Sequence, residues 1–411
     1  MSSDTATDAS DTTAAVNLVE LLFGPDRDAA FARLLDGPAI RPATYFDGSQ
    51  VWLVTRYHDI LGVLSDKRFS NDITKQSKSN LTASIGLPED VAPYFLHTLG
   101  TYDPPDHTRL RRLLSREFTP RRVTQLRPRI QEITDELLDS LAAEPEADLI
   151  DRFAKPLPVS VICELLGIPA DDRSRWLAWS EALISGDLEK IADGARNLVA
   201  YLKDLLEEKR KAPGEDVLSG LMQAHEDGDR LSTEELVSLS LSLLIGGHDN
   251  TVNLIANGTL MLLTHPGQLA RLRAEPDTMP TAVEELFRFA GPADIGVLRY
   301  ALEPVEIGGV TIPAGDAVQV VYATGNRDPR RFEDPDRLDL ARVDKAHLGL
   351  GHGIHHCIGA ALARAEGEIA LSRLITRFPD LELAADPAGF TWKPATSRAL
   401  AALPVRPGTP A

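Results

Sequence analysis

The segment 350–359 constrains this chain more than any other, because it places one of only two cysteines among glycines and histidines. It reads Leu-Gly-His-Gly-Ile-His-His-Cys-Ile-Gly, with the cysteine at Cys357. Directly after it, the periodicity of Ala and Leu predicts a helix from Ala360 to Phe378. The free N–H groups and positive dipole end of such a helix stabilise a thiolate, a good ligand for a soft metal ion. The glycines would also let a flat cofactor approach the backbone closely.

Three other interpretations of the cysteine remain open. A zinc site built from His352, His355, His356 and Cys357 would require adjacent side chains to converge on one small ion, and the chain has no Cys-x-x-Cys pair. A nucleophilic Cys357 with a histidine base would need an acyl-transfer architecture, which the surrounding sequence lacks. A buried, inert cysteine is the plainest interpretation, and Cys163, in a mostly apolar helical segment, illustrates it.

The composition is that of an ordinary globular protein. The 411 residues are 43% hydrophobic and 25% charged. A net charge of −18 makes nucleic acid an unfavourable partner, because phosphates are repelled. Two cysteines do not make a disulfide framework, so we expect a reducing compartment, the cytoplasm.

The N-terminal residues 1–13 are rich in Ser, Thr, Asp and Ala and lack the basic start and apolar core of a signal peptide. We expect them to be a disordered lead, followed by a single domain over 14–411. The apolar stretches are interrupted well before the ~20 residues that a membrane-spanning helix needs. We therefore expect no membrane partner, and we expect a monomer.

Hydrophobic periodicity predicts a mainly helical fold with a smaller β region. Alternating apolar residues around turns at 47–48 and 308–309 predict the β segments. Residues 71–99 lack strong periodicity and have the length of a functional loop over a binding site. The other main elements are predicted as a hairpin at 43–54, a second β region at 297–322, and helices at 123–141, 188–211 and 232–264.

The centre of the long helix predicted at 232–264 departs from its apolar surroundings. Residues 232–235, Ser-Thr-Glu-Glu, predict a capping box at its start. Residues 246–251, Gly-Gly-His-Asp-Asn-Thr, then interrupt the apolar run, although glycine costs a helix interior roughly 1 kcal/mol relative to alanine and a buried aspartate needs a partner. Locally unfavourable choices of this kind often mark functional sites; a kink near the surface is the alternative.

The cysteine segment resembles the heme-binding loop of cytochrome P450 monooxygenases, commonly FGxGxHxCxG. The resemblance implies a triangular, helix-rich single domain, with heme b between the long central helix and the cysteine-loop helix and Cys357 as the axial ligand of the iron. The chain departs from the pattern at Leu350, where the family usually has Phe near the sulfur side of the heme, which affects redox tuning rather than ligation. The positions kept are Gly351, Gly353, His355, Cys357 and Gly359.

A second match to the family precedes the cysteine segment. Glu285 and Arg288 resemble its ExxR motif, which alone is weak evidence because an i,i+3 ion pair suits any helix. The resemblance makes Arg337, which ends a Phe-Glu-Asp-Pro-Asp-Arg run, the third member of their ion-pair network. We expect these three residues to be scaffold rather than chemistry.

A third match, at 103–111, resembles the helix of the family that holds the heme propionates. His107 and Arg111 share one helix face at i and i+4. By resemblance they pair with a propionate, together with Arg299 and His355. The physical chemistry agrees, because two buried carboxylates require cationic or hydrogen-bonding partners.

By the same resemblance, the centre of the long helix is the oxygen-binding groove, usually (A/G)Gx(D/E)T. Gly246 and Gly247 fit the first two positions and Asp249 fits the acid, but Asn250 stands where the family has Thr. Thr251 follows one place later, rotated ~100° around the helix, so it cannot simply substitute. An amide relays a proton less readily than a hydroxyl. We expect Asn250 to order a water or a substrate hydroxyl that completes a relay from Asp249; weak proton delivery is the alternative.

The resemblance implies a monooxygenase that inserts one atom of O₂ into a hydrophobic small molecule, by hydroxylation or epoxidation. It looks closest to members that oxidise macrolides and other polyketides, a similarity carried by residues 253–258 and 103–118. The chain has no flavin or nicotinamide motif, so electrons from NAD(P)H would arrive through a ferredoxin and a ferredoxin reductase. The basic run from Arg109 to Arg122 would attract an acidic ferredoxin.

Substrate contacts are expected at Gly246, Ile295 and Val297. Two other functions remain open. A peroxide-driven oxygenase or decarboxylase generally carries an arginine in this helix, and none stands near Asp249. A non-catalytic heme protein, acting as a sensor or recruitment platform, is favoured by Asn250 but disfavoured by the intact acid.

Overall fold

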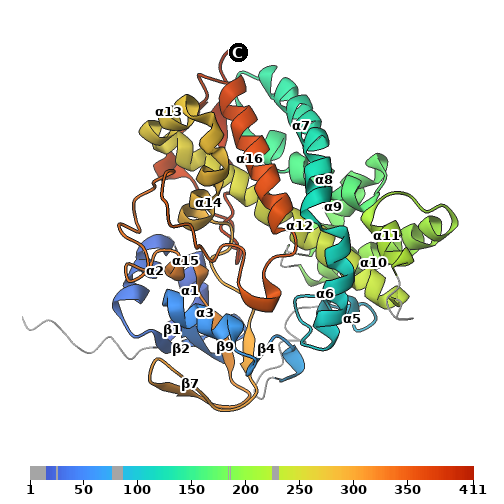
Figure 1. Ribbon diagram of the computed structural model, residues 1–411, viewed down its shortest axis with the longest axis vertical. Helices are drawn as coiled ribbons and strands as arrows, with labels where there is room; N and C mark the ends of the chain where they lie inside the picture. The colour runs from blue at the N-terminus through green and yellow to red at the C-terminus, as the bar shows by residue number, and fades with distance from the viewer. Residues whose placement is uncertain (1–14, 25, 76–86, 184, 186, 225–230) are drawn as a thin grey trace, which may run out of the picture.

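Helices make up most of the structure, and a smaller β region lies at one side of them (Figure 1), as predicted. The computed structural model describes residues 15–24, 26–75, 87–183, 185, 187–224 and 231–411; the predicted lead at 1–13 and part of the loop predicted at 71–99 lie outside them. The α-helices are α1 (Leu18–Phe23), α2 (Arg27–Asp36), α3 (Tyr57–Ser65), α5 (Ala92–Leu96), α6 (Asp106–Glu117), α7 (Pro120–Ala142), α8 (Pro156–Leu166), α9 (Arg173–Ala182), α10 (Leu188–Lys211), α11 (Val217–Gln223), α12 (Thr233–Thr264), α13 (Pro266–Ala274), α14 (Met279–Ala290), α15 (Tyr322–Gly325) and α16 (Ala360–Arg377). Within the described residues, every helix is too short or too polar to span a bilayer.

The main sheet brings together strands from the two β regions that the sequence predicts. Its order is β1-β2-β3-β9-β6-β4, and the predicted hairpin is β2 and β3, which pair antiparallel with Ile40 opposite Val54. Parallel pairing of β3 with β9 then joins the N-terminal hairpin to the second region. The strands are β1 (Val16–Asn17), β2 (Ile40–Thr44), β3 (Gln50–Val54), β4 (Phe69–Ser70), β5 (Ala147–Asp148), β6 (Arg299–Ala301), β7 (Val305–Ile307), β8 (Val310–Ile312), β9 (Ala317–Val320), β10 (Glu382–Leu383) and β11 (Pro404–Arg406).

The helix α12 crosses the molecule beneath α16 (Figure 1) and spans ~48 Å over its 32 residues. The predicted capping box begins it: the Glu235 N–H donates to Ser232 Oγ at 3.1 Å, and the Ser232 N–H donates to the Glu235 carboxylate at 2.8 Å. Along its length α12 packs against α8, α10, α14 and α16, and most of its apolar side chains are buried. This helix therefore fixes the position of its own polar centre relative to the cysteine loop.

The end points of the other helices follow from local capping. The predicted helix at 188–211 coincides with α10, whose first turn is capped by the Asp187 carboxylate. The predicted helix at 123–141 begins three residues earlier, at Pro120, because the Thr119 hydroxyl accepts from the Arg122 N–H at 3.2 Å and proline suits the first helical position.

A buried ion-pair network connects α14 to the segment that leads into the cysteine loop. Glu285 and Arg288 have fully buried side chains and form two hydrogen bonds, of 2.7 and 2.8 Å. Arg288 also donates to the backbone carbonyls of Asn326 and Pro335, at 2.9 and 2.8 Å. The pair therefore ties α14 to the irregular segment 326–340, as a scaffold would.

The third member of this network is Arg342, and the prediction of Arg337 is wrong. The Arg342 Nε lies 3.2 Å from Glu285 Oε1, and its side chain is 9% exposed. The Arg337 side chain is 65% exposed and pairs with Asp339 at 3.2 Å. Only the Arg337 carbonyl faces the network, accepting from Arg288 at 3.3 Å, so its side chain points outward.

Replacing Arg342 should therefore destabilise the protein more than replacing Arg337. Arg342→Ala removes a cation and one hydrogen-bond donor from the buried Glu285 carboxylate, which should cost about 2 kcal/mol in free energy of unfolding. Arg337→Ala, on the surface, should change it by no more than about 0.5 kcal/mol. Urea unfolding of both variants measures the difference, and equal losses would contradict the assignment.

Candidate active site

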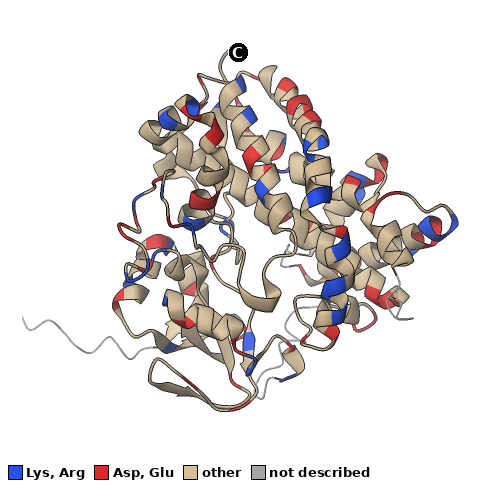
Figure 2. Ribbon diagram, viewed as in Figure 1, with Lys and Arg blue, Asp and Glu red and all other residues tan. Residues whose placement is uncertain are grey.

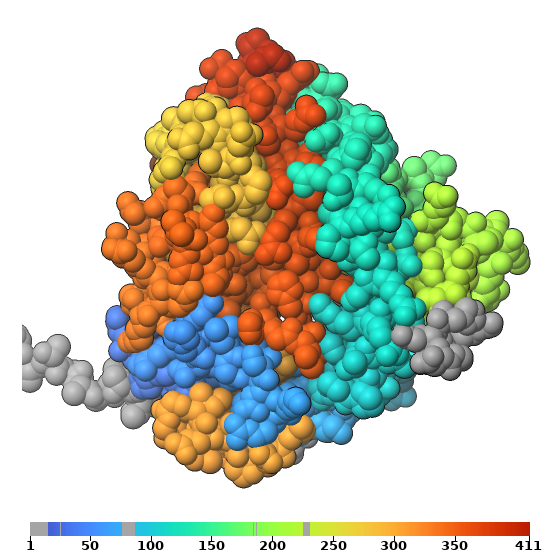
Figure 3. All heavy atoms as spheres, in the orientation of Figure 1, coloured from blue at the N-terminus to red at the C-terminus, as the bar shows by residue number. Residues whose placement is uncertain are grey.

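The cysteine loop holds Cys357 just before the first turn of α16. The Cys357 N–H donates to the Leu350 carbonyl at 2.9 Å, which closes the loop on itself. Gly351 and Gly353 have φ values of +72° and +71°, which side-chain-bearing residues rarely adopt. A Cβ at Gly353 would also lie 2.4 Å from the Leu64 carbonyl of α3. The loop thus packs tightly on α3, and Figure 3 shows it in red-orange between blue α3 and teal α6.

The Cys357 side chain faces a cavity of about 380 Å³, whose opposite wall is α12. Burial raises the pKa of the free thiol, while the Gly359 N–H and the positive charges of Arg111 and Arg364 oppose that rise. The expected stabilisation of a thiolate is thus present but smaller than the cost of burial. A metal ion bound to the sulfur would reverse the balance, because a coordinating thiol loses its proton.

Two glycines of α12 have different surroundings at this wall. A Cβ at Gly246 would meet nothing within 4 Å, so this residue leaves open space above the loop. A Cβ at Gly247 would lie 2.9 Å from the Ile162 side chain, so Gly247 permits close packing of α8 on α12. Gly246, Ile295 and Val297, the residues predicted to contact substrate, all line the cavity.

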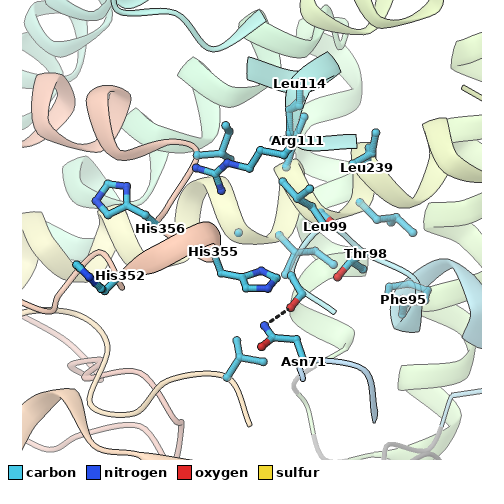
Figure 4. A pocket seen from close by; sticks show the side chains of 18 of the residues that line it. Asn71, Phe95, Thr98, Leu99, Arg111, Leu114, Leu239, His352, His355 and His356 are labelled. Carbon is cyan, nitrogen blue, oxygen red and sulfur yellow. Dashed lines mark hydrogen bonds between the residues drawn. The ribbon is translucent and has the colours of Figure 1, made fainter. Parts of the chain in front are cut away.

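Nitrogen-bearing side chains converge at one end of the site. His355 from the cysteine loop and Arg111 from α6 point into an adjoining cavity of about 500 Å³ (Figure 4), which Arg299 of β6 also lines. The His107 ring lies 4.3 Å from the His355 ring. His107 Nε2, Arg299 Nε and His355 Nε2 are buried and have no hydrogen-bond partner among the described residues. The structure therefore brings together the four side chains predicted to hold propionates.

The pKa values of these buried groups indicate that an anion would stabilise their charged forms. Burial and then the charges of Arg299, His107 and Arg111 lower the pKa of His355 to about 3. Burial likewise lowers the pKa of Arg299 and that of Arg111. Buried cations without a carboxylate are costly, so a ligand that brings two carboxylates fits this end of the site. Together with the open wall at Gly246 and the sulfur of Cys357, the residues fit heme b.

The three polar residues predicted to act at the centre of α12, Asp249, Asn250 and Thr251, contact different groups. The Asp249 carboxylate accepts from Ser397 Oγ at 3.3 Å and from Asn253 Nδ2 at 3.4 Å. Asn250 lines the cavity that contains Cys357. Thr251 lines the same cavity, is 5% exposed, and lies beside Glu366 of α16, rotated ~100° around the helix from Asn250.

Glu366 is a functional candidate that the sequence analysis missed. It lies on α16 beside Thr251, lines the same cavity and is 1% exposed. Burial raises the pKa of Glu366 to about 8, while the Thr251 hydroxyl opposes the rise. The carboxyl is therefore mainly protonated at neutral pH. The sequence did contain a sign of this role, because Glu366 stands among apolar residues on one face of the helix predicted at 360–378.

A charge cluster adjoins the wall that carries Ile295 and Val297; Arg27 and Asp294 are buried in it, and Asp28 is 68% exposed. Asp294, fully buried, pairs with Arg27 of α2 at 2.8 Å and faces Arg398 at 3.9 Å. Arg398 in turn pairs with Asp28 of α2 at 2.5 Å. The cluster joins the N-terminal helix, the cavity wall and the C-terminal turn that supplies Ser397.

The zinc interpretation of the cysteine segment has a geometric requirement that the described residues do not meet. Among them, no three His, Cys, Asp or Glu side chains are grouped so that they could hold a metal ion. His352 and His356 point away from His355 in the close view (Figure 4).

Together, one cysteine, an open glycine wall and an anion-binding end define a heme-thiolate site. The comparisons with known proteins agree with this class. The family model described as cytochrome P450 matches residues 170–384. The chain belongs to the cytochrome P450 family.

Curated relatives and solved structures match over almost the whole chain. It is 44% identical to 6-deoxyerythronolide B hydroxylase of Saccharopolyspora erythraea, over 93% of this chain and 96% of the relative. It is 39% identical to the polyketide biosynthesis cytochrome P450 PksS of Bacillus subtilis, over 86% and 88%. The tirandamycin C-bound P450 monooxygenase TamI matches with a TM-score of 0.87 and 40% identity, over 96% of this chain and 100% of TamI. The protein is a heme-dependent monooxygenase, as predicted.

Glu366 gives the stability of this protein a specific dependence on pH. The folded state keeps the carboxyl proton up to a pKa of about 8, whereas the unfolded chain releases it near 4.5. The folded protein therefore loses stability as pH rises between these values. Glu366→Gln removes this loss, so the variant should gain stability over wild type by on the order of 3 kcal/mol at pH 8 and by much less at pH 5.5.

Urea unfolding at both pH values measures this difference. Glu382→Gln, which replaces an exposed carboxyl, controls for the general effect of removing one negative charge. A gain of the same size at both pH values would show that Glu366 is ionised in the folded protein.

Proposed function

We propose that this monooxygenase hydroxylates or epoxidises a macrolide or another polyketide. The names of the relatives support the class, since one is a hydroxylase of 6-deoxyerythronolide B, one serves polyketide biosynthesis and one binds tirandamycin C. The apolar wall at Ile295 and Val297, and two adjoining cavities of about 380 and 500 Å³, suit a large hydrophobic ligand beside the cofactor.

In the proposed mechanism, Cys357 supplies the sulfur ligand of heme b, and His107, Arg111, Arg299 and His355 hold its carboxylates. When bound, a heme with a thiolate ligand activates O₂ for insertion of one oxygen atom into a C–H bond or an alkene. The protein orients the substrate against the apolar wall and keeps bulk water from the reacting atoms. These tasks use the packing of the cavity and need no further cofactor.

In this proposal, Asp249 supplies protons to the part of the cavity that lies against the centre of α12. The contact of its carboxylate with Ser397 Oγ and Asn253 Nδ2 holds it at the edge of the cavity. Asn250 orders a water or a substrate hydroxyl between Asp249 and the reacting oxygen. Thr251 and the protonated Glu366 lie on the opposite side of this water and can donate to it.

Electrons come from NAD(P)H through a ferredoxin and a ferredoxin reductase, in the cytoplasm. Figure 2 shows blue segments, Lys or Arg, along α6 and at the start of α7. Some arginines of the predicted basic run line the cavity or pair with acids. Arg111 lines the cavity. Arg109 pairs with Glu235, and Arg122 pairs with Glu117. The positive potential of α6 and the start of α7 is therefore smaller than the six arginines of the sequence suggest.

Titration of the purified holoenzyme with macrolactones, other polyketides, terpenes and fatty acids tests the substrate class. A polyketide should move the Soret band from its low-spin to its high-spin position, because a ligand in the cavity displaces water from the iron. A shift with terpenes or fatty acids alone would contradict the polyketide proposal. The same ligand should then yield an oxygenated product with NADPH and a ferredoxin system; binding without product would favour a non-catalytic heme protein.

The coupling of the reaction tests the role of Asn250. In Asn250→Ala, product formed per NADPH oxidised should fall several-fold, because the ordered water is lost. Asn250→Thr, which restores the family hydroxyl, should retain coupling. A ratio unchanged in Asn250→Ala would reject this role.

Electron transfer should depend on charge at α6. The rate of reduction by an acidic ferredoxin should fall as salt rises, and Arg112→Glu should lower it several-fold at low salt. Arg337→Glu, the same charge reversal at an exposed arginine outside α6, is the matched control. Rates that do not respond to salt or to Arg112→Glu would leave α6 as a solvated basic helix.

A further inference from the structure

A second ion pair joins α14 to α16 near the cysteine loop. It consists of Glu284, the neighbour of Glu285 in the chain, and Arg364. The Glu284 carboxylate accepts from Arg364 Nε at 2.5 Å and from Arg364 Nη2 at 3.0 Å, which is a two-point contact. It also lies 3.1 Å from His347 Nε2. These contacts lower the pKa of Glu284 to about 2, against the effect of burial. Glu284 is therefore a carboxylate at all physiological pH values.

His347 connects this carboxylate to the backbone of the cysteine loop. The Gly349 N–H donates to His347 Nδ1 at 3.1 Å, so Nδ1 is the unprotonated nitrogen and Nε2–H donates to Glu284. The His347 ring also stacks on Phe287, with ring centres 5.3 Å apart. Gly349 directly precedes Leu350, whose carbonyl receives the Cys357 N–H. A continuous chain of contacts thus runs from Glu284 to the residue that carries the sulfur.

Arg364 brings a positive charge close to the same sulfur. It lies on the second turn of α16, seven residues after Cys357, and its side chain is 33% exposed. Arg364 and Arg111 are the cations that favour the thiolate at Cys357. Glu368, the other acid that acts on Arg364, is itself paired with Arg127 at 2.8 Å. The charge of Arg364 at the sulfur is therefore offset mainly by one carboxylate, Glu284.

We propose that Glu284 is a positioning residue that sets the reduction potential of the iron bound at Cys357. It does so by neutralising Arg364 beside the sulfur and by holding His347 against the cysteine loop. The inference rests on the heme-thiolate function and adds to it a residue that neither ligates the iron nor belongs to the Glu285–Arg288 scaffold. Reduction adds one electron to the heme, so an uncompensated positive charge nearby favours the reduced state and an uncompensated negative charge opposes it.

Two charge-removing variants should shift the potential in opposite directions. Glu284→Gln leaves Arg364 uncompensated, so the potential of the purified holoenzyme should become more positive than in wild type. Arg364→Gln removes the cation paired with Glu284 and a cation beside the sulfur, so the potential should become more negative. The double variant should return most of the way to wild type. Spectroelectrochemical titration of the Soret band measures each value without turnover.

Glu164→Gln is the matched control. Glu164 of α8 forms the same two-point contact with an arginine, Arg129, at 2.9 and 2.8 Å, and its side chain is 25% exposed against 20% for Glu284. Its replacement removes the same charge away from the cysteine loop and should shift the potential much less. Shifts of the same sign in Glu284→Gln and Arg364→Gln, or no larger than in Glu164→Gln, would overturn the proposal and leave the pair as a scaffold.

If a variant that removes a charge also loses heme, a variant that keeps the charge provides a second test. Arg364→Lys retains the charge and should keep a potential close to wild type, whereas Arg364→Gln should not; equal potentials in these two variants would reject the electrostatic role. Failure of the underlying function is distinguishable, because wild-type protein would then lack the spectrum of a thiolate-ligated heme in its reduced CO complex.

Discussion

The rest of the site depends on a set of buried nitrogen donors that converge at one end of the cavity. His107, Arg111, Arg299 and His355 come from α6, β6 and the cysteine loop. Asp103 acts on His107 and Arg299, but one nitrogen of each of His107, Arg299 and His355 has no hydrogen-bond partner among the described residues. Burying cations in this way is unfavourable unless a ligand supplies the anion. A cofactor that carries carboxylates would supply this anion, and its binding would then add to the folding free energy of the holoenzyme.

The central helix α12 both packs in the core and carries polar residues at the active site. Along most of α12 apolar residues pack against neighbouring helices, among them α8, α10, α14 and α16, which fixes its axis. At its centre, Gly246 leaves space on one side while Gly247 lets α8 approach on another. Asp249 is exposed at this centre, unlike the buried aspartate that the sequence suggests, and it accepts from Ser397 and Asn253. A rigid helix thus carries polar groups at positions that a loop would hold less accurately.

The sequence was sufficient for the elements with strong local signals. The capping box at Ser232, the period of α10 and the cysteine loop with its glycines were predictable, because capping, periodicity and backbone sterics act within a few residues. The resemblance to a known family then supplied the heme. Long-range choices were not predictable in the same way. Arg337 and Arg342 lie five residues apart in an irregular segment, and only the path of the backbone decides which side chain reaches Glu285.

Glu366 and Ser397 were missed for a related reason. Each acts across a gap between elements far apart in the chain, Glu366 toward Thr251 and Ser397 toward Asp249. Helical periodicity marks Glu366 as lying on a buried face but does not identify the neighbouring helix. A polar residue on a predicted apolar face deserves the same scrutiny as a motif.

The cluster of Arg27, Asp28, Asp294 and Arg398 constrains how a binding pocket of this kind can diversify. Its four charges come from three segments far apart in the chain, and the buried Asp294 is compensated by Arg27 and Arg398 together. A recombination event that exchanged the wall around Asp294 without α2 and the C-terminal turn would bury an unmatched charge. New substrate ranges should therefore arise more readily by point substitution at the apolar positions Ile295 and Val297 than by shuffling of segments between related genes.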